Sequence, residues 1–357
     1  MKCVQCERDA KYKDRANGKC PGCGHPFAFE PQKGDPITDM ALKKAMDRVG
    51  SSGKVRWTVD HLYQELRRPP RGIARILIPG LIGLGLLLAA VVLPFKSLFV
   101  LLIAAVGVVF CLVAVRRRFP QNRFNRSAVE ALLQRWSDVH GSPSSLLINR
   151  QLPPAPSRAL EEELSAYSFD RAVICDRHAI VDVLLANQFH FENNCAVLCD
   201  DGYPENTFPI IMRMLRKNPK LNVFVLHDAS PRGCMLAHKL RTSPEWFAGI
   251  GQVIDVGLRP AHARFFPGMA EKNPVPLKIT PTHGIDAAEA KWLSRWRLEM
   301  TVVRPEQLIK RLYRAMTGVE QGGWGAGTGN GGSTGGADVI YFGTDADTSD
   351  GGGDSFG

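Results

Sequence analysis

The sequence predicts a multi-domain chain made of a small cysteine ribbon, a two-helix transmembrane hairpin and a Rossmann-like α/β domain with a mainly parallel sheet. Three observations lead to this fold class. Two Cys-x2-Cys pairs lie near the N-terminus, two apolar runs of about eighteen residues lie in mid-chain, and short apolar strands alternate with amphipathic helices in the second half. The 357 residues leave room for several modules of this kind.

The first module, residues 1–31, contains the cysteine pairs Cys3/Cys6 and Cys20/Cys23. Two such pairs complete the tetrahedral four-sulfur shell that zinc prefers, and about thirty residues bury too little apolar surface to fold without a metal. We expect structural zinc, with a redox dithiol or an iron site as alternatives. The module resembles the zinc ribbons of many bacterial membrane and regulatory proteins, which implies recognition or stabilisation and no chemistry.

Residues 37–69 contain two predicted helices, over 38–46 and 58–66, each preceded or opened by a residue that caps helices. A turn separates them, and residues 55–57 have the composition of a short strand. A helix, a turn and a helix beside a short strand would form a small winged-helix-like unit. The alternative is a helical spacer.

Residues 76–115 hold two apolar runs without any Asp, Glu, Lys or Arg inside them, separated by a short break at 93–97. As a helix each run is about 27 Å long, close to the hydrocarbon thickness of a bilayer. Arginines flank the pair of runs on both sides: Arg67, Arg68, Arg71 and Arg75 before it, and Arg116, Arg117, Arg118 and Arg123 after it. The positive-inside rule then predicts a multi-pass protein of the inner (cytoplasmic) membrane with both termini cytosolic and the lipid bilayer as a partner. The alternative is a buried hairpin of a soluble core.

The third module, residues 157–316, has the pattern of an α/β domain. Apolar strands are predicted over 171–175, 195–199, 221–226 and 252–256, with helices over 178–188, 205–217 and 232–240 between them. A helix over 287–296, a strand over 298–303 and a helix over 305–316 close the domain. Continuous apolar strands that alternate with helices predict a mainly parallel sheet covered on both faces.

Acidic residues follow three of these strands: Asp176 the first, Asp200 and Asp201 the second, and Asp228 the third. The carboxyl ends of parallel strands lie at one edge of the sheet, where ligands bind in open α/β folds. Carboxylate oxygens there would suit Mg²⁺. The alternative for each residue alone is a helix cap or a turn.

Residues 172–240 resemble the Toprim domain of the topoisomerase VI A subunit and its relative that makes meiotic double-strand breaks. That family shows a strand ending in Glu, a Gly-Tyr-Pro turn, and a strand ending in Asp-x-Asp-Pro-x-Gly. This chain has Val-Ile-Cys-Asp-Arg-His-Ala at 173–179, Gly-Tyr-Pro-Glu at 202–205 and Val-Leu-His-Asp-Ala-Ser-Pro-Arg-Gly at 225–233.

The resemblance implies that Asp176 replaces the acid-base Glu, that Asp228 is a metal-binding Asp, and that Ser230 stands where the second such Asp belongs. A hydroxyl gives up the charged ligand that Mg²⁺ requires, so the site looks degraded unless Asp200 or Asp201 repairs it. The family's nucleophile is a tyrosine on a winged-helix domain, for which Tyr63 is the candidate here.

Residues 317–357 are rich in Gly, Ser, Thr and Asp and are predicted to be a disordered acidic tail. Residues 1–316 carry all 45 Lys and Arg but only 29 of the 35 acids, a net charge of +16. Such a body favours anionic partners, either an anionic membrane surface or nucleic acid.

Three classes of function follow. The first is a membrane-anchored zinc-ribbon protein in which a degenerate Toprim-like domain acts as a binding or scaffold module for an unknown protein partner. The second is a Mg²⁺-dependent nuclease or phosphotransfer enzyme that uses Asp176 and Asp228. The third is a membrane-tethered nucleic-acid-binding protein that uses the ribbon and the basic body.

Overall fold

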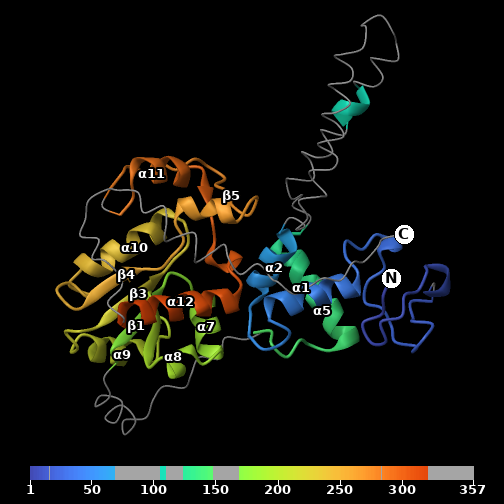
Figure 1. Cartoon of the computed structure of the whole chain (residues 1–357), viewed down its shortest axis with the longest axis horizontal. Helices are drawn as coiled ribbons and strands as arrows, with labels where there is room; N and C mark the ends of the chain where they lie inside the picture. The colour runs from blue at the N-terminus through green and yellow to red at the C-terminus, as the bar shows by residue number, and fades with distance from the viewer. Residues whose placement is uncertain (16, 69–104, 110–123, 148–168, 283, 321–357) are drawn as a thin grey trace, which may run out of the picture. The chain divides into compact units, whose positions relative to one another are not determined.

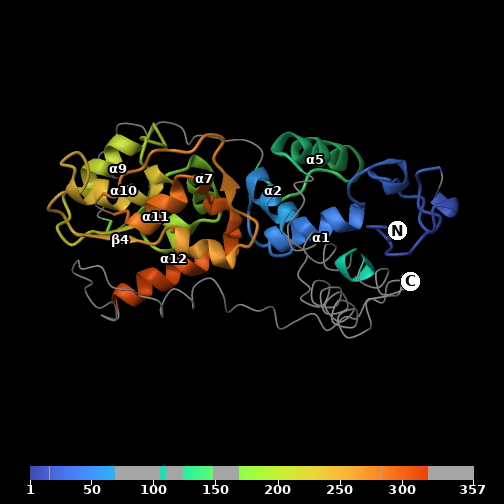
Figure 2. The same ribbon diagram turned by 90° about the horizontal axis from the view of Figure 1, so that it is seen from above.

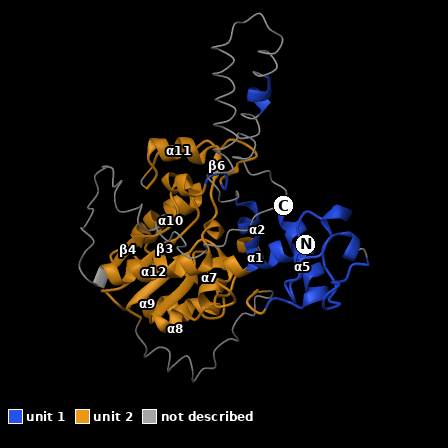
Figure 3. Cartoon of the chain, turned by 45° about the vertical axis from the view of Figure 1, so that its right-hand side comes forward, with its two compact units in different colours: residues 1–46, 62–143, 267–269 blue, residues 47–61, 144–266, 270–357 orange. Residues whose placement is uncertain are grey.

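The computed structural model describes residues 1–15, 17–68, 105–109, 124–147, 169–282 and 284–320, and two views of it are given in Figure 1 and Figure 2. The chain divides into two compact units, coloured separately in Figure 3. Unit 1 comprises residues 1–46, 62–143 and 267–269, and unit 2 comprises residues 47–61, 144–266 and 270–357. Each unit is described below by itself.

The predicted transmembrane hairpin is wrong. Within the described ranges, none of the helices has the length and the apolar character that a bilayer crossing needs. Residues 105–109 of the predicted hairpin are described and are helical. Residues 76–104 and 110–115 of the prediction lie outside the described residues. The predicted inner-membrane localisation depended on the hairpin and is contradicted with it.

Unit 1 is built from the cysteine ribbon and helical segments. The ribbon includes two short 3₁₀ turns, η1 (Lys13–Arg15) and η2 (Pro31–Lys33). The helices are α1 (Asp39–Val49), α2 (Val59–Arg67) and α5 (Arg126–His140), of which α1 and α2 contribute residues to both units. The side chain of Asn125 caps α5 by accepting the Ala128 N–H at 2.7 Å. Helices α1 and α2 occupy the two predicted helical stretches of residues 37–69.

A buried carboxylate joins the ribbon to the helices of unit 1. Asp39 is fully buried and accepts the backbone N–H groups of Ala28 and Phe29, each at 2.9 Å. It also bonds His140 at 2.8 Å, and the other ring nitrogen of His140 bonds His25 at 2.8 Å. Asp39, His140 and His25 thus form one chain of hydrogen bonds within unit 1.

Unit 2 is organised around a parallel sheet, as predicted. The strands pair in the order β2-β1-β3-β4: β1 (Arg171–Cys175), β2 (Cys195–Cys199), β3 (Asn222–Leu226) and β4 (Gln252–Asp255). Because the chain moves from β1 to one side and later returns to the other, the switch point lies at the carboxyl ends of β1 and β3. Ligands of open α/β sheets generally bind at this point.

Helices cover the sheet and fix its edge. α7 (His178–Ala186) and α8 (Phe189–Glu192) connect β1 to β2, α9 (Phe208–Leu215) connects β2 to β3, and α10 (Pro231–Thr242) connects β3 to β4. Met212 and Leu215 of α9 and Leu236 and Leu240 of α10 pack in one apolar core on a single face of the sheet. The strand residues of that core are Ala172, Ile174, Ala196, Leu198, Val223, Val225 and Val253. Right-handed crossovers place α7 on the other face.

The rest of unit 2 closes the domain after β4. It consists of η3 (Pro260–Phe265), a two-stranded ribbon of β5 (Glu271–Lys272) and β6 (Trp296–Arg297), α11 (Ala287–Leu293), η4 (Met300–Val302) and α12 (Pro305–Glu320). Figure 2 shows α9 and α10 next to each other, with α12 at the opposite side of unit 2. Residues 321–357 of the predicted disordered tail lie outside the described residues, and residues 317–320 belong to α12.

Two predicted strands are shorter in the structure. Residues 55–57 form a single parallel bridge, between Trp57 and Leu146. Residues 298–303 form one antiparallel bridge, between Ala229 and Leu298, followed by η4. The backbone N–H of Met300 bonds the Asp228 carboxylate at 2.6 Å, so it is not available for a strand ladder. The Asp228 side chain, two residues beyond the end of β3, therefore interrupts the predicted strand.

His61 makes the stability of the chain sensitive to acid. The ring is 2 % exposed, Nδ1 bonds the Thr58 hydroxyl at 2.8 Å, and Nε2 has no hydrogen-bond partner in the part of the chain that is described. Burial lowers the pKa of His61 to about 3. In the unfolded chain His61 therefore binds a proton near pH 6.5, whereas in the folded chain it stays neutral at that pH.

We predict that the folded chain loses about 1.4 kcal/mol of stability through His61 for each pH unit below about 6.5, until the pH approaches the folded pKa. The His61→Leu variant lacks this loss. The measurement is the difference in free energy of urea unfolding between the two chains from pH 7 to pH 4. A difference that does not change with pH would contradict the prediction.

Candidate functional site

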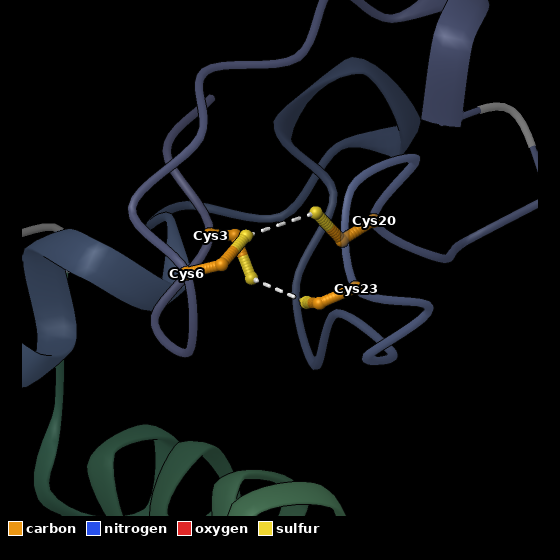
Figure 4. A group of neighbouring side chains, drawn as sticks. All are labelled: Cys3, Cys6, Cys20 and Cys23. Atoms are coloured by element: carbon orange, nitrogen blue, oxygen red, sulfur yellow. Dashed lines mark hydrogen bonds between the residues drawn. The ribbon is translucent and has the colours of Figure 1, made fainter.

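The four cysteines of the ribbon converge on one point (Figure 4). The sulfur atoms of Cys3 and Cys23 are 3.7 Å apart, those of Cys6 and Cys20 are 3.6 Å apart, and all four lie within 4.8 Å of one another. A tetrahedral ion with bonds of about 2.3 Å to sulfur holds its ligand atoms about 3.8 Å apart. The four cysteines could therefore bind one metal ion such as zinc.

Two equivalent loops present these sulfurs. In each loop the fourth residue after the first cysteine donates its backbone N–H to the carbonyl of that cysteine: Glu7 to Cys3 at 3.0 Å, and Gly24 to Cys20 at 2.9 Å. Both donors have a positive φ, 57° at Glu7 and 73° at Gly24. The left-handed conformation closes the turn, and Gly24 adopts it without the strain that a side chain adds.

Backbone donors also stabilise the thiolate form. The N–H groups of Gln5 and Gly22 point at the sulfurs of Cys3 and Cys20, each at 3.4 Å. The N–H of Gly22 lowers the pKa of the Cys20 thiol to about 6. Metals bind thiolates and not thiols, so the lowered pKa of Cys20 favours the form of this residue that binds a metal.

The second candidate site is the carboxyl edge of the sheet in unit 2. Asp176 lies just after β1, and Asp228 lies just after β3. The two residues lie side by side, and the Asp228 backbone N–H donates to Asp176 Oδ2 at 2.8 Å. Oδ1 of Asp176 is buried and has no hydrogen-bond partner among the residues described. Burial, and then the neighbouring Asp228 carboxylate, raise the pKa of Asp176 to about 7.

Both carboxylate oxygens of Asp228 are already engaged. Oδ2 accepts from the guanidinium of Arg177, and Oδ1 accepts the backbone N–H of Met300 at 2.6 Å. Arg177 also donates to Glu299 at 3.1 Å. Asp228 is 4 % exposed, and Glu299 is 5 % exposed. The result is a buried ion-pair group of one arginine and two acids that closes the β1/β3 switch point.

The other predicted ligands lie in different surroundings. Both oxygens of Asp200 accept from Arg232, at 2.8 and 2.9 Å, and Asp201 bonds His178 at 2.6 Å. The Ser230 hydroxyl caps α10 by accepting the Gly233 N–H at 3.1 Å. Within the described ranges, the carboxylate oxygens of Asp176, Asp200, Asp201 and Asp228 do not form one group of metal-binding size.

A third charged group flanks the same edge and was not predicted. His227 is fully buried, and its ring bonds the Asp228 backbone carbonyl at 2.7 Å and the Asp255 carboxylate at 2.9 Å. Both partners only accept, so both ring nitrogens carry a proton and the ring is a cation. Burial alone would lower the pKa of His227, but the Asp255 carboxylate raises it. A Cβ on Gly257 would lie 2.3 Å from the ring, so only glycine fits there.

Sequence reasoning missed Arg177, His227 and Glu299. Arg177 and His227 are direct neighbours of predicted acids, and a basic residue beside a buried aspartate was the available signal. Glu299 had no such signal, because it is 122 positions from Arg177 and only the fold brings them together. The predicted nucleophile, Tyr63, lies in α2 with its ring 8 % exposed and the Arg67 guanidinium 5.1 Å from the ring centre.

We predict that Asp176→Asn removes a pH-dependent penalty on folding. The folded chain protonates Asp176 at a pH about three units above the unfolded chain, so wild-type stability falls as the pH rises from about 4 to about 7. The variant should gain on the wild type by about 1.4 kcal/mol per pH unit in this window. Urea unfolding of both chains at several pH values tests this. A stability advantage that is equal at pH 5 and pH 7 would refute it.

Comparisons of this chain with models of protein families, with curated proteins and with solved structures found no match. The resemblance of residues 172–240 to the Toprim domain stays a prediction from sequence motifs.

Proposed function

We propose that this chain is a zinc-ribbon protein whose Toprim-like α/β domain acts as a binding or scaffold module and does not cleave nucleic acid. One observation carries the proposal: the two oxygens of Asp228 are taken by Arg177 and by the Met300 N–H. A metal-dependent nuclease of this type needs that carboxylate for its cation. In this chain the Arg177 guanidinium donates to that carboxylate, which supports a role without a bound cation.

The charges around Asp228 argue further against Mg²⁺. The cation prefers several oxygen ligands in octahedral geometry and gives up its water reluctantly. At this edge the Arg177 guanidinium already neutralises Asp228, and Ser230 uses its hydroxyl as a helix cap. Asp200 pairs with Arg232 and lies 3.8 Å from the Lys239 ammonium, so it is not free to replace a missing acid. A bound Mg²⁺ would have to break several of these bonds at once.

The unpartnered oxygen of Asp176 supports a functional role for the edge in place of a purely structural one. A buried polar atom without a partner destabilises a fold by about 1 to 3 kcal/mol, and sequences usually tolerate this at binding or catalytic sites. The acid stands beside two cations, Arg177 and His227, which also contribute to its electrostatic environment. A ligand or partner that binds this edge would contact charged groups whose positions are already fixed by the fold.

We assign zinc to the cysteine site and give it a structural role. Four sulfurs complete a tetrahedral shell, which leaves no position for substrate or water. The ribbon buries few large side chains, so an apparent zinc-binding free energy of about 10 to 16 kcal/mol would stabilise the fold of this segment. The nearby Asp39, His140 and His25 would then join the metal-bound loops to α1 and α5.

We predict that the full chain does not cleave DNA or RNA and does not hydrolyse nucleotides in the presence of Mg²⁺ or Mn²⁺, because Asp228 has no oxygen to offer. Gel electrophoresis and nucleotide chromatography measure the two activities. Asp228→Asn is the matched variant and should be equally inactive. Cleavage by the wild type that Asp228→Asn abolishes would overturn the proposal in favour of the nuclease. Salt-sensitive retention of uncleaved DNA would identify nucleic acid as the bound partner.

We predict that removal of the metal unfolds the ribbon and leaves the sheet intact. Cys20→Ser or treatment with a strong chelator should abolish hydrogen-exchange protection of the Glu7 and Gly24 amides, while the amides of β1 and β3 keep theirs. Cys195→Ser is the control, since this thiol is 1 % exposed in β2 and belongs to unit 2. Unchanged protection of the ribbon after chelation would exclude the structural metal.

A further inference from the structure

Three side chains at the β1/β2 end of the sheet edge form a second group of metal-binding size. Nε2 or Nδ1 of His178, Sγ of Cys199 and a carboxylate oxygen of Asp201 all lie within 4.8 Å of one another. His178 is the first residue of α7, Cys199 is the last residue of β2, and Asp201 lies in the following turn. The pairing of Cys175 with Cys199 in the parallel register brings the ends of β1 and β2 together.

We propose that His178, Cys199 and Asp201 form a second metal site, which takes a Zn²⁺-class transition metal with three protein ligands and an open fourth position. It is separate from the cysteine ribbon and uses neither Asp176 nor Asp228, and it shares only Asp201 with the acids that the sequence predicted to bind Mg²⁺. The proposal does not depend on the binding role given above.

The donor set fits this class of ion. Imidazole nitrogen, thiolate sulfur and carboxylate oxygen are the three ligand types that zinc takes, at about 2.0 to 2.3 Å. A tetrahedral ion with such bonds holds its ligand atoms about 3.3 to 3.8 Å apart. Separations up to 4.8 Å therefore need a contraction of about 1 Å, and the 2.6 Å bond between His178 and Asp201 would open to admit the ion. Mg²⁺ would not be favoured, because it prefers oxygen ligands.

The three ligands differ in exposure in a way that leaves one side open. Cys199 is fully buried, whereas the side chains of His178 and Asp201 are 28 % and 44 % exposed. An ion bound between them would have sulfur on its inner side and solvent on its outer side. Sites with three protein ligands and an accessible fourth position bind water or a small anionic ligand there.

Neighbouring groups hold the ligands in place. The Tyr203 ring stacks on the His178 ring, with 4.3 Å between ring centres and 21° between planes, and the Tyr203 hydroxyl donates to Asp182. The turn that carries Asp201 is closed by two backbone bonds, from Cys199 N–H to the Tyr203 carbonyl at 2.8 Å and from Gly202 N–H to the Cys199 carbonyl at 3.2 Å. Supporting contacts of this kind orient the ligands of natural metal sites.

The simpler interpretation is a surface ion pair beside a buried thiol. Burial raises the pKa of Cys199, so without a metal this thiol is a small apolar group. A divalent cation would favour the thiolate, and the carboxylate and the thiolate together would then balance its charge. The two interpretations differ in the number of ions that the chain holds.

Metal content distinguishes them. The full chain is loaded with Zn²⁺, passed over a desalting column and analysed by atomic emission, with protein quantified by amino-acid analysis. We expect two zinc ions per wild-type chain, and one in each of the variants His178→Ala, Asp201→Asn and Cys20→Ser. Cys195→Ser should retain two. Zinc retained at one per chain by the wild type, or at two by His178→Ala, would overturn the second site.

Cobalt spectroscopy gives an independent test that leaves the buried Cys199 unchanged. The Cys20→Ser chain lacks the ribbon site but keeps the proposed second site. Co²⁺ bound to this chain should show a sulfur-to-metal charge-transfer band and visible bands of tetrahedral intensity. Asp201→Asn in the same background should bind Co²⁺ at least about tenfold more weakly, since it removes an anionic ligand. Absence of the charge-transfer band from the Cys20→Ser chain, with the sheet amides still protected from exchange, would refute a thiolate-bound metal.

Discussion

The ion pair between Arg177 and Asp228 determines how the carboxyl edge of unit 2 is closed. Arg177 follows β1, Asp228 follows β3, and the Met300 N–H that completes the group comes from the last part of the domain. Asp228 is almost fully buried, so its charge requires these partners. Removing Arg177 would leave two buried acids, Asp228 and Glu299, without their shared cation. The same group therefore joins the segments that follow the first and third strands to the C-terminal part of the domain.

Much of unit 2 could be predicted from the sequence because its strands are continuous apolar runs. The predicted bounds of β1 and β2 agree with the structure, and those of β3 and β4 differ by one residue. The cysteine site could also be predicted, since two Cys-x2-Cys pairs can satisfy a four-sulfur shell with few alternatives. In these cases local spacing determines the outcome.

The strand that the structure interrupts depends on a partner distant in the sequence. The strand predicted at 298–303 is interrupted because Asp228 takes the Met300 N–H. Asp200 and Ser230 stay predicted cation ligands; in the structure Asp200 accepts from Arg232 and the Ser230 hydroxyl caps α10. The transmembrane prediction rested on apolar length and flanking arginines alone, and the described helices do not have the required character. Periodicity and composition do not show which side chains distant in the sequence will contact each other in the fold.

The sheet edge has two halves with opposite properties. At the β1/β3 half, Arg177 and the Met300 N–H fill the space around Asp228, and His227 is enclosed by backbone and by Asp255. At the β1/β2 half, His178 and Asp201 remain partly exposed above a buried thiol. An open α/β sheet binds ligands beyond its carboxyl ends, and side chains decide which part of that edge stays accessible. Because the switch point is closed, the accessible side chains of this edge lie beside β2. The donors there include nitrogen and sulfur, whereas Mg²⁺ prefers oxygen ligands alone.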